Sequence, residues 1–165
     1  MHDFTKLYHE TKPQVFRYIY LLCGDKVTAE ELTQETFYQA YLSFKTFKGS
    51  SKRSTWVVGI ARNVYLKHCR RERYISQKEI NFNQLRAPDA EEPAKVLDTK
   101  ESETEIITVL QTLPEQYSSV IIFREIEGLS FEEIGKLLMK SPSTVRVLLF
   151  RAKKRFRELY TKKYG

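Results

Sequence analysis

The sequence is poor in cysteine: its 165 residues include only Cys23 and Cys69, and the two do not form a CxxC pair. Two isolated cysteines exclude a disulfide framework and favour a reducing compartment. Long apolar runs are also absent, since no segment reaches the roughly 18 residues that a membrane-spanning helix needs. The first residues, MHDFTKLYHE, are too polar for a secretory signal peptide. These absences predict a cytoplasmic protein.

Residue patterns for catalysis are missing as well. The three histidines lie far apart, and there is no HExxH segment, cysteine cluster or glycine-rich phosphate loop. Glu30, Glu31 and Glu35 form a cluster of acids, but no histidine accompanies them. A nuclease that uses a metal ion needs clustered carboxylates or histidines. We therefore expect a protein that is not an enzyme and that has no catalytic residue, metal or cofactor.

Glycine and proline are sparse, with six and five residues, and no segment alternates apolar and polar side chains as a half-buried strand does. Helix signals are frequent instead. A first helix ends at Gly24 and contains Pro13, which could kink or split it. Thr28 with Glu31 has the spacing of a capping box, and Ser54 is a suitable N-cap. The helices expected in the first half cover residues 3–23, 28–47 and 54–73.

Residues 75–100 differ in character, with two prolines, many polar residues and no regular period, and we expect a flexible linker. Pro114, the capping box of Ser130 and Glu133, and the N-cap Ser141 mark helix starts in the second half. The four helices expected there cover residues 101–112, 114–127, 131–139 and 142–162. The predicted fold class is all-α: a three-helix bundle at 1–74, the linker at 75–100, and a four-helix bundle with a helix-turn-helix at 101–165.

The positive charge is concentrated in two blocks. The formal net charge is +7, yet residues 48–74 alone carry eight basic residues against one acid, and residues 141–165 carry the same. Residues 101–140 are acidic, with eight acids against three basic residues. Such separated basic blocks indicate binding to a nucleic acid or another anionic surface. A basic face that is merely solvated is the alternative.

Residues 130–162 have the spacing of a helix-turn-helix unit. Ile134, Leu137 and Leu138 give a short helix one apolar face, and a similar face follows after a tight turn. The start of the last helix then points outward, where hydroxyl and guanidinium groups can read base edges and phosphates. The alternative is an ordinary helical hairpin with a basic, solvated helix. The candidate DNA-binding residues are Ser143, Thr144, Arg146, Val147, Arg151 and Lys154.

The segment STWVVGIARNVYLKHCRRER, residues 54–73, carries two stripes at helical spacing. One stripe is apolar and faces a core; it consists of Val57, Ile60, Ala61 and Val64. The other is polar, aromatic and cationic, and it extends to the residue after the segment; its members are Trp56, Gly59, Asn63, Lys67, Arg70 and Tyr74. The second stripe faces either water or a partner, and composition alone does not decide between them.

Three segments, in order, resemble the extracytoplasmic-function sigma factors of bacterial RNA polymerase. AEELTQETFYQAY, residues 29–41, is similar to region 2.2 of that family. Residues 54–73 are similar to regions 2.3 to 2.4, usually written W-L-x-x-I-A-R-N. The segment from LPEQYSSVIIF to LLFRAKKRF, residues 113–156, is similar to region 4. The resemblance implies a factor that gives core polymerase its promoter specificity, with DNA opened by binding energy alone.

The resemblance assigns the second stripe to the minus-ten element. Asn63 and the loop 46–53 would line a pocket for a flipped base, and cationic side chains would hold the separated strand. Trp56 would either stack on a base or anchor its helix in the core, and Gly59 would permit close approach or helix packing. The implied single-strand-binding residues are Lys52, Arg53, Trp56, Arg62, Asn63, Lys67, Arg70 and Arg71.

The resemblance also implies partners. Glu31, Gln34 and Glu35 match positions that contact the clamp helices of the largest polymerase subunit, and the flap region is a second polymerase contact. The helix-turn-helix would read the minus-thirty-five element, although Val147 stands where the family often has Ser and Leu148 where it often has Arg. The phase of the helix places Leu148 on the core face. An anti-sigma factor is a further implied partner.

The strongest alternative is another helix-turn-helix regulator of transcription, with residues 1–74 as a sensing or dimerisation module. This alternative leaves the first basic block without a role. Tight, duplex-specific binding by the isolated protein would favour such a regulator, whereas a sigma factor needs core polymerase for specific binding.

Overall fold

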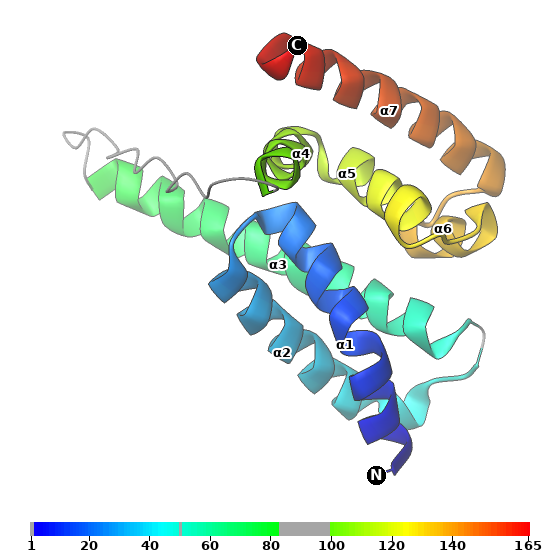
Figure 1. Cartoon of the computed structure of the whole chain (residues 1–165). Helices are drawn as coiled ribbons and strands as arrows, with labels where there is room; N and C mark the ends of the chain where they lie inside the picture. The colour runs from blue at the N-terminus through cyan, green and yellow to red at the C-terminus, as the bar shows by residue number, and fades with distance from the viewer. Residues whose placement is uncertain (1, 50, 83–99) are drawn as a thin grey trace.

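The structure is a computed structural model that describes residues 2–49, 51–82 and 100–165. This part of the chain is helical and contains no strand (Figure 1), which confirms the predicted all-α class. A short 3-10 helix, Phe44–Thr46, follows α2, and one π turn, Ile122–Ile126, follows α5. The α-helices are α1 (His2–Cys23), α2 (Lys26–Ser43), α3 (Arg53–Phe82), α4 (Lys100–Thr112), α5 (Glu115–Ile121), α6 (Phe131–Leu138) and α7 (Pro142–Tyr164).

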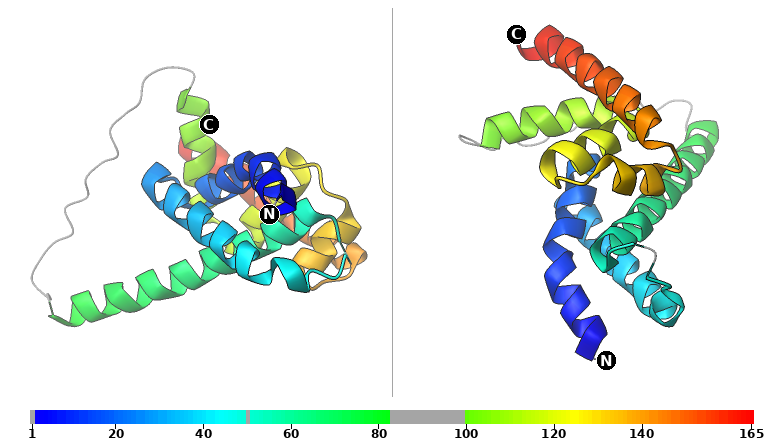
Figure 2. Two further views of the ribbon diagram at one scale, coloured as in Figure 1. Left: turned by 90° about the horizontal axis from the view of Figure 1, so that it is seen from below. Right: turned by 90° about the vertical axis from the view of Figure 1, so that its right-hand side faces the viewer.

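Helices α1, α2 and α3 form the first bundle (Figure 1). Val15 and Ile19 of α1, Ala29 of α2 and Val57 and Ala61 of α3 are fully buried in its core. The apolar stripe predicted for residues 54–73 therefore faces the core, with Ile60 and Val64 only partly covered. α1 runs through Pro13 without a break. Beyond the core, the C-terminal part of α3 projects past α1 and α2 (Figure 2).

The ends of two helices differ from the prediction. α2 starts at Lys26 because the carboxylate of Asp25 accepts hydrogen bonds from the backbone and hydroxyl of Thr28, at 3.0 and 2.5 Å. The capping-box prediction for Thr28 with Glu31 is therefore wrong. α3 starts at Arg53, one residue before the expected cap, and continues to Phe82, so the first eight residues assigned to the linker are helical. The rest of the predicted linker, 83–99, lies outside the described residues.

Helices α4 to α7 form the second bundle, and its two predicted serine caps are confirmed. The hydroxyl of Ser130 accepts from the backbone of Glu133 and donates to its carboxylate, and Ser141 accepts from the backbone of Thr144. Pro114 occupies the N-cap position of α5. Met139 links α6 to α7 in the left-handed region, with φ of 56°, which produces the tight turn of the helix-turn-helix.

The two bundles also pack directly on each other. α1 lies against α4 and α5, and α3 lies against α6, so one apolar core crosses the boundary between the bundles (Figures 1 and 2). At its centre the ring of Tyr18 stacks on Phe123, with 4.9 Å between ring centroids. α7 lies on the side of the second bundle that faces away from α1–α3 (Figure 1). The chain therefore presents α7 on an outer surface while its inner helices meet the first bundle.

Candidate nucleic-acid interface

α7 presents the predicted upstream-element residues on its exposed side. Val145, Leu149 and Ala152 turn inward and are buried, and Leu148 packs partly buried against the core, as its phase predicts. The Ser141 cap holds the first turn, with its hydroxyl 3.2 Å from the Ser143 hydroxyl and 2.8 Å from the Thr144 hydroxyl. All six predicted residues are exposed: Ser143, Thr144, Arg146, Val147, Arg151 and Lys154.

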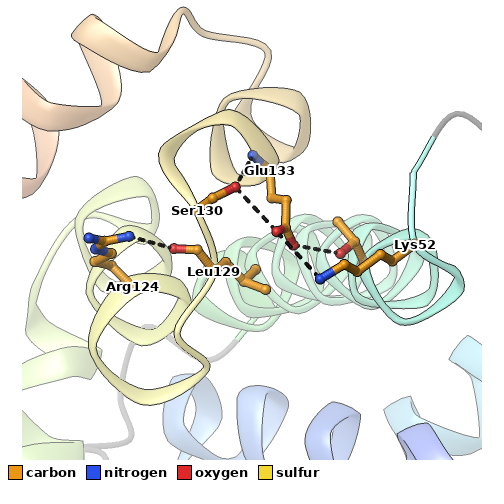
Figure 3. A network of polar contacts seen from close by, with 6 residues as sticks. Lys52, Arg124, Leu129, Ser130 and Glu133 are labelled. Atoms are coloured by element: carbon orange, nitrogen blue, oxygen red, sulfur yellow. Dashed lines mark hydrogen bonds and ion pairs between the residues drawn. The ribbon is translucent and has the colours of Figure 1, made fainter.

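Arg146 is positioned by the ring of Phe131 at the start of α6. Its guanidinium carbon lies 4.9 Å from the centre of that ring, and Arg124 lies over the same ring at 4.2 Å. Arg124 also donates a hydrogen bond of 3.0 Å to the carbonyl of Leu129 (Figure 3). The contact places the Arg146 guanidinium beside the start of α6.

A groove between α2 and α3 collects the central residues of the first basic block. Asn63, Lys67 and Arg71 line one wall from α3, and Glu35 and Gln39 line the other from α2. Gln39 donates a hydrogen bond of 2.9 Å to Glu35. The groove has a volume of about 530 Å³, and its α3 wall combines an amide with positive charge. The predicted base-reading Asn63 and the predicted polymerase-binding Glu35 thus share one groove.

The three predicted polymerase-binding residues are exposed on α2, but they face different neighbours. Glu31 and Glu35 lie four residues apart, on one side of the helix. Gln34 instead lines a second groove, between α1 and α2, together with Tyr8 and Lys12. A partner that contacts all three residues must therefore span the outer surface of α2.

Trp56 and Gly59 serve helix packing in this structure. Trp56 is half-buried against the core, and its ring lies 5.0 Å from that of Phe47. A Cβ on Gly59 would lie 3.2 Å from the side chain of Leu137 in α6. The glycine therefore permits α6 to approach α3 closely, and the packing interpretation accounts for both residues.

Arg62 is directed toward the second bundle and away from the groove. Its guanidinium forms two hydrogen bonds with the Glu115 carboxylate, at 2.7 and 2.9 Å, and its side chain is only 14% exposed. Burial is the largest single influence and lowers the pKa of Arg62, but the hydrogen bonds to Glu115 and the negative charge of that carboxylate together raise the pKa above its ordinary value. The group stays charged, and here it does not share the open surface of Asn63, Lys67 and Arg70.

The start of α3 meets an acid of the helix-turn-helix. Glu133 accepts a hydrogen bond of 3.1 Å from Thr55, and its carboxylate lies 4.0 Å from the ammonium of Lys52 (Figure 3). Lys52 remains 77% exposed, so this ion pair is weak. Arg53 is exposed and lies over the Phe44 ring, at 5.5 Å. Both cations remain accessible to a partner.

Two family models match most of the chain: "Sigma-70 region 2" matches residues 7–74, and "Sigma-70, region 4" matches residues 103–156. The RNA polymerase sigma factor YlaC of Bacillus subtilis (strain 168) is 32% identical over 158 residues, which cover 94% of this chain and 91% of the relative. The ECF RNA polymerase sigma-E factor of Haemophilus influenzae is 32% identical over 133 residues, covering 74% of this chain and 69% of the relative. The chain belongs to the ECF sigma factors.

A solved structure supports the same fold for this sigma factor. The sigma factor RpoE from Bartonella quintana, in complex with the anti-sigma factor NepR, aligns with a TM-score of 0.75, covering 98% of each chain at 22% sequence identity. The region 2 match falls within α1–α3 and the region 4 match within α4–α7, so the first bundle contains region 2 and the second contains region 4. None of the described helices has the length and apolar character to cross a membrane.

Regions 2 and 4 of this sigma factor meet through residues that the sequence analysis missed. Tyr18 is fully buried, and its hydroxyl lies 2.8 Å from that of Ser119. Ser119 donates its single proton to Glu115, at 2.7 Å, so Tyr18 is the donor to Ser119. Glu127 is 3% exposed and accepts two hydrogen bonds from Arg17, at 2.9 and 2.7 Å. Acids of region 4 therefore neutralise cations of region 2.

Proposed function

We propose that the chain binds core RNA polymerase and directs promoter-specific initiation of transcription by recognising and opening promoter DNA. The observation that supports this most strongly is the pair of exposed cationic surfaces, one on region 2 and one on region 4, in a chain of this family. The protein itself performs no catalysis: binding energy favours the open duplex, and the polymerase carries out the chemistry. It acts in the cytoplasm, where the polymerase and the chromosome are found.

Region 2 would bind the non-template strand of the minus-ten element along α3. Asn63 offers an amide to the edge of an unpaired base, and Lys67, Arg70 and Arg71 offer charge to its phosphates. Flipping a base out of the stack costs a few kcal/mol, which such contacts must offset. Arg62 would join this surface only after it separates from Glu115.

Region 4 would dock the first turns of α7 in the major groove of the minus-thirty-five element. The exposed hydroxyls of Ser143 and Thr144 and the guanidinium of Arg146 lie at the helix N-terminus, where the helix dipole also favours phosphate. Arg151 and Lys154 follow within three turns and would contact the backbone, so affinity should fall as salt rises.

Two protein partners follow from this function. Core polymerase is the first: Glu31, Gln34 and Glu35 would contact the clamp helices of its largest subunit, and region 4 would contact its flap region. An anti-sigma factor is the second partner, because the Bartonella quintana relative was crystallised with one. Such a protein would inhibit by covering the surfaces that polymerase and DNA need.

The deciding experiment is transcription in vitro with purified core polymerase and this chain on a library of genomic fragments, with start sites mapped. We expect initiation at a limited set of sites that share two upstream elements. Initiation without defined sites would refute the proposal. Tight operator binding without polymerase would instead support a helix-turn-helix regulator of another kind.

Replacing Asn63 by alanine should lower the yield of open complex about tenfold, because the base-reading amide is lost while the helix is kept. Binding of core polymerase should not change. Permanganate reactivity of unpaired thymines measures opening, and Gln116→Ala, an exposed amide on α5, is the matched control. Equal opening by Asn63→Ala and the parent protein at saturating concentration would contradict the assignment.

Replacing Arg146 by alanine should weaken upstream-element recognition about tenfold and leave polymerase binding intact, since one groove contact is lost. Promoter competition between intact and scrambled upstream elements measures the preference. Arg157→Ala removes an exposed arginine from a later turn of α7 and serves as the control. An unchanged preference ratio in Arg146→Ala would show that this residue does not read the element.

A further inference from the structure

Two apolar side chains lie on the exposed face of the N-terminal half of α7. Val147 is 49% exposed and Phe150 is 66% exposed. They lie three residues apart, so they share one side of the helix, opposite the buried Val145, Leu149 and Ala152. Phe150 was assigned no role by the sequence analysis. The sequence could have indicated its exposure: Val147 follows Ser143 by four residues and Phe150 follows Val147 by three, and residues at these spacings face the same side of a helix.

Folding does not account for this pair. Neither side chain belongs to the apolar cluster that the described residues form. Their neighbours on the exposed side are cations, Arg146, Arg151 and Lys154, and no acid occurs between residues 143 and 154. Two apolar side chains exposed side by side are more favourable in contact with a partner than in water. The surrounding cations favour a partner that is anionic.

The major groove of duplex DNA has the matching chemistry. Its rims are phosphates, which complement the cations, and its floor offers hydrogen-bonding groups together with apolar base edges, of which the C5-methyl group of thymine protrudes furthest. Val147 and Phe150 cannot donate or accept hydrogen bonds, so methyl groups are the base-edge atoms that they can recognise. The hydrogen-bonding side chains of this face lie closer to the helix N-terminus, at Ser143, Thr144 and Arg146.

We propose that Val147 and Phe150 determine sequence specificity by contacting thymine methyl groups in the upstream promoter element. This inference rests on the proposed function, since it assumes that α7 enters that element. The inference adds a chemical requirement to that function: thymine must occupy one or two positions that face the N-terminal half of α7. Burial of a methyl group removes little area, so each contact should change affinity about threefold to fivefold.

Uracil substitution tests the proposal, because uracil pairs as thymine does and lacks only the methyl group. Holoenzyme assembled from core polymerase and the full chain is assayed on a mapped promoter in which each upstream thymine is replaced by uracil, one at a time. Competition binding measures the affinity ratio between thymine and uracil templates. We expect a threefold to fivefold loss at one or two positions for the parent protein.

In each of the variants Val147→Ala and Phe150→Ala, the ratio of thymine-template affinity to uracil-template affinity should fall to about 1 at one of these positions. Val27→Ala removes an exposed valine from α2 and should retain the parent ratios. Uracil in the minus-ten element serves as the control for the modified template.

Three results would overturn the inference. One is a mapped upstream element that is required yet contains no thymine or shows no uracil effect. Another is a Phe150→Ala variant whose uracil ratio equals that of the parent. A third is an equal loss of binding affinity on thymine and uracil templates for both variants, which would indicate that this face of α7 docks on a protein. In each case promoter-specific initiation persists, so the proposed function stands, and its own failure would appear as the absence of defined start sites.

Discussion

Replacing Tyr18 by alanine is expected to lower the free energy of unfolding by about 3–5 kcal/mol, the usual cost of deleting a large buried aromatic side chain. The residue is fully buried between α1 and the second bundle, its ring stacks on Phe123, and its hydroxyl donates to Ser119. Burial raises the pKa of the Tyr18 hydroxyl, so the group remains a protonated donor throughout the physiological range. The deletion therefore leaves a cavity at the boundary between the two regions.

The same variant should also separate the unfolding of the two bundles. Trp56 is the only tryptophan and lies in region 2, so its fluorescence reports on the first bundle, whereas far-UV circular dichroism reports on helices in both. In urea the two signals should coincide for the parent protein and diverge for Tyr18→Ala, because the shared core is broken.

Two control variants define the origin of the effect. Tyr18→Phe keeps the ring and loses one hydrogen bond, so it should cost about 1 kcal/mol. Tyr38→Ala deletes a tyrosine that is 57% exposed on α2, and it should change stability by about 0.5 kcal/mol or less. A loss below about 1 kcal/mol for Tyr18→Ala, with coincident signals, would show that the interface between the bundles does not form in solution.

Local signals explain which parts of the fold could be predicted. Ser130 and Ser141 cap their helices as expected, because each cap depends on residues within three positions. Asp25 and Thr28 are both suitable caps, and the stronger N-cap preference of aspartate agrees with the cap that forms. α3 continues past residue 74 because no glycine or proline occurs between residues 75 and 82 to end it.

Contacts between the bundles could not be predicted in this way. Periodicity indicates which side of a helix is buried, but it does not identify the partner. The sequence analysis assigned Tyr18 no role, yet its side chain contacts Phe123 and Ser119 because α1 is covered by the second bundle as well, through α4 and α5. Glu115, Glu127 and Glu133 are typical of a solvated acidic surface, and their partners lie 53 to 110 residues away in sequence.

This arrangement gives a second large expected effect, at the pair of Arg62 and Glu115. Glu115→Gln should lower the free energy of unfolding by about 1–3 kcal/mol, since it leaves a mostly buried guanidinium without its counter-charge. The same change should increase binding of the free chain to a single-stranded minus-ten oligonucleotide, because Arg62 becomes available to a phosphate.

The salt dependence distinguishes this mechanism from a general gain of positive charge. One additional phosphate contact on a single strand should steepen the slope of log K against log salt by about 0.7. Glu132→Gln removes the same charge from an exposed position on α6 and should leave the slope unchanged. In the double variant of Arg62→Ala with Glu115→Gln the extra slope should disappear, because the freed cation is gone.

A double-mutant cycle on the two residues then measures how strongly region 4 holds this cation of region 2. Residues that share an ion pair in one network usually couple by about 0.5–3 kcal/mol, and the two short hydrogen bonds at low exposure place this pair in the upper part of that range. A coupling energy near zero, with identical salt slopes for the parent and Glu115→Gln, would mean that Arg62 is free in solution. A large coupling would mean that promoter binding by Arg62 requires the two regions to move apart, and the free energy of that separation would have to come from contacts with polymerase and DNA.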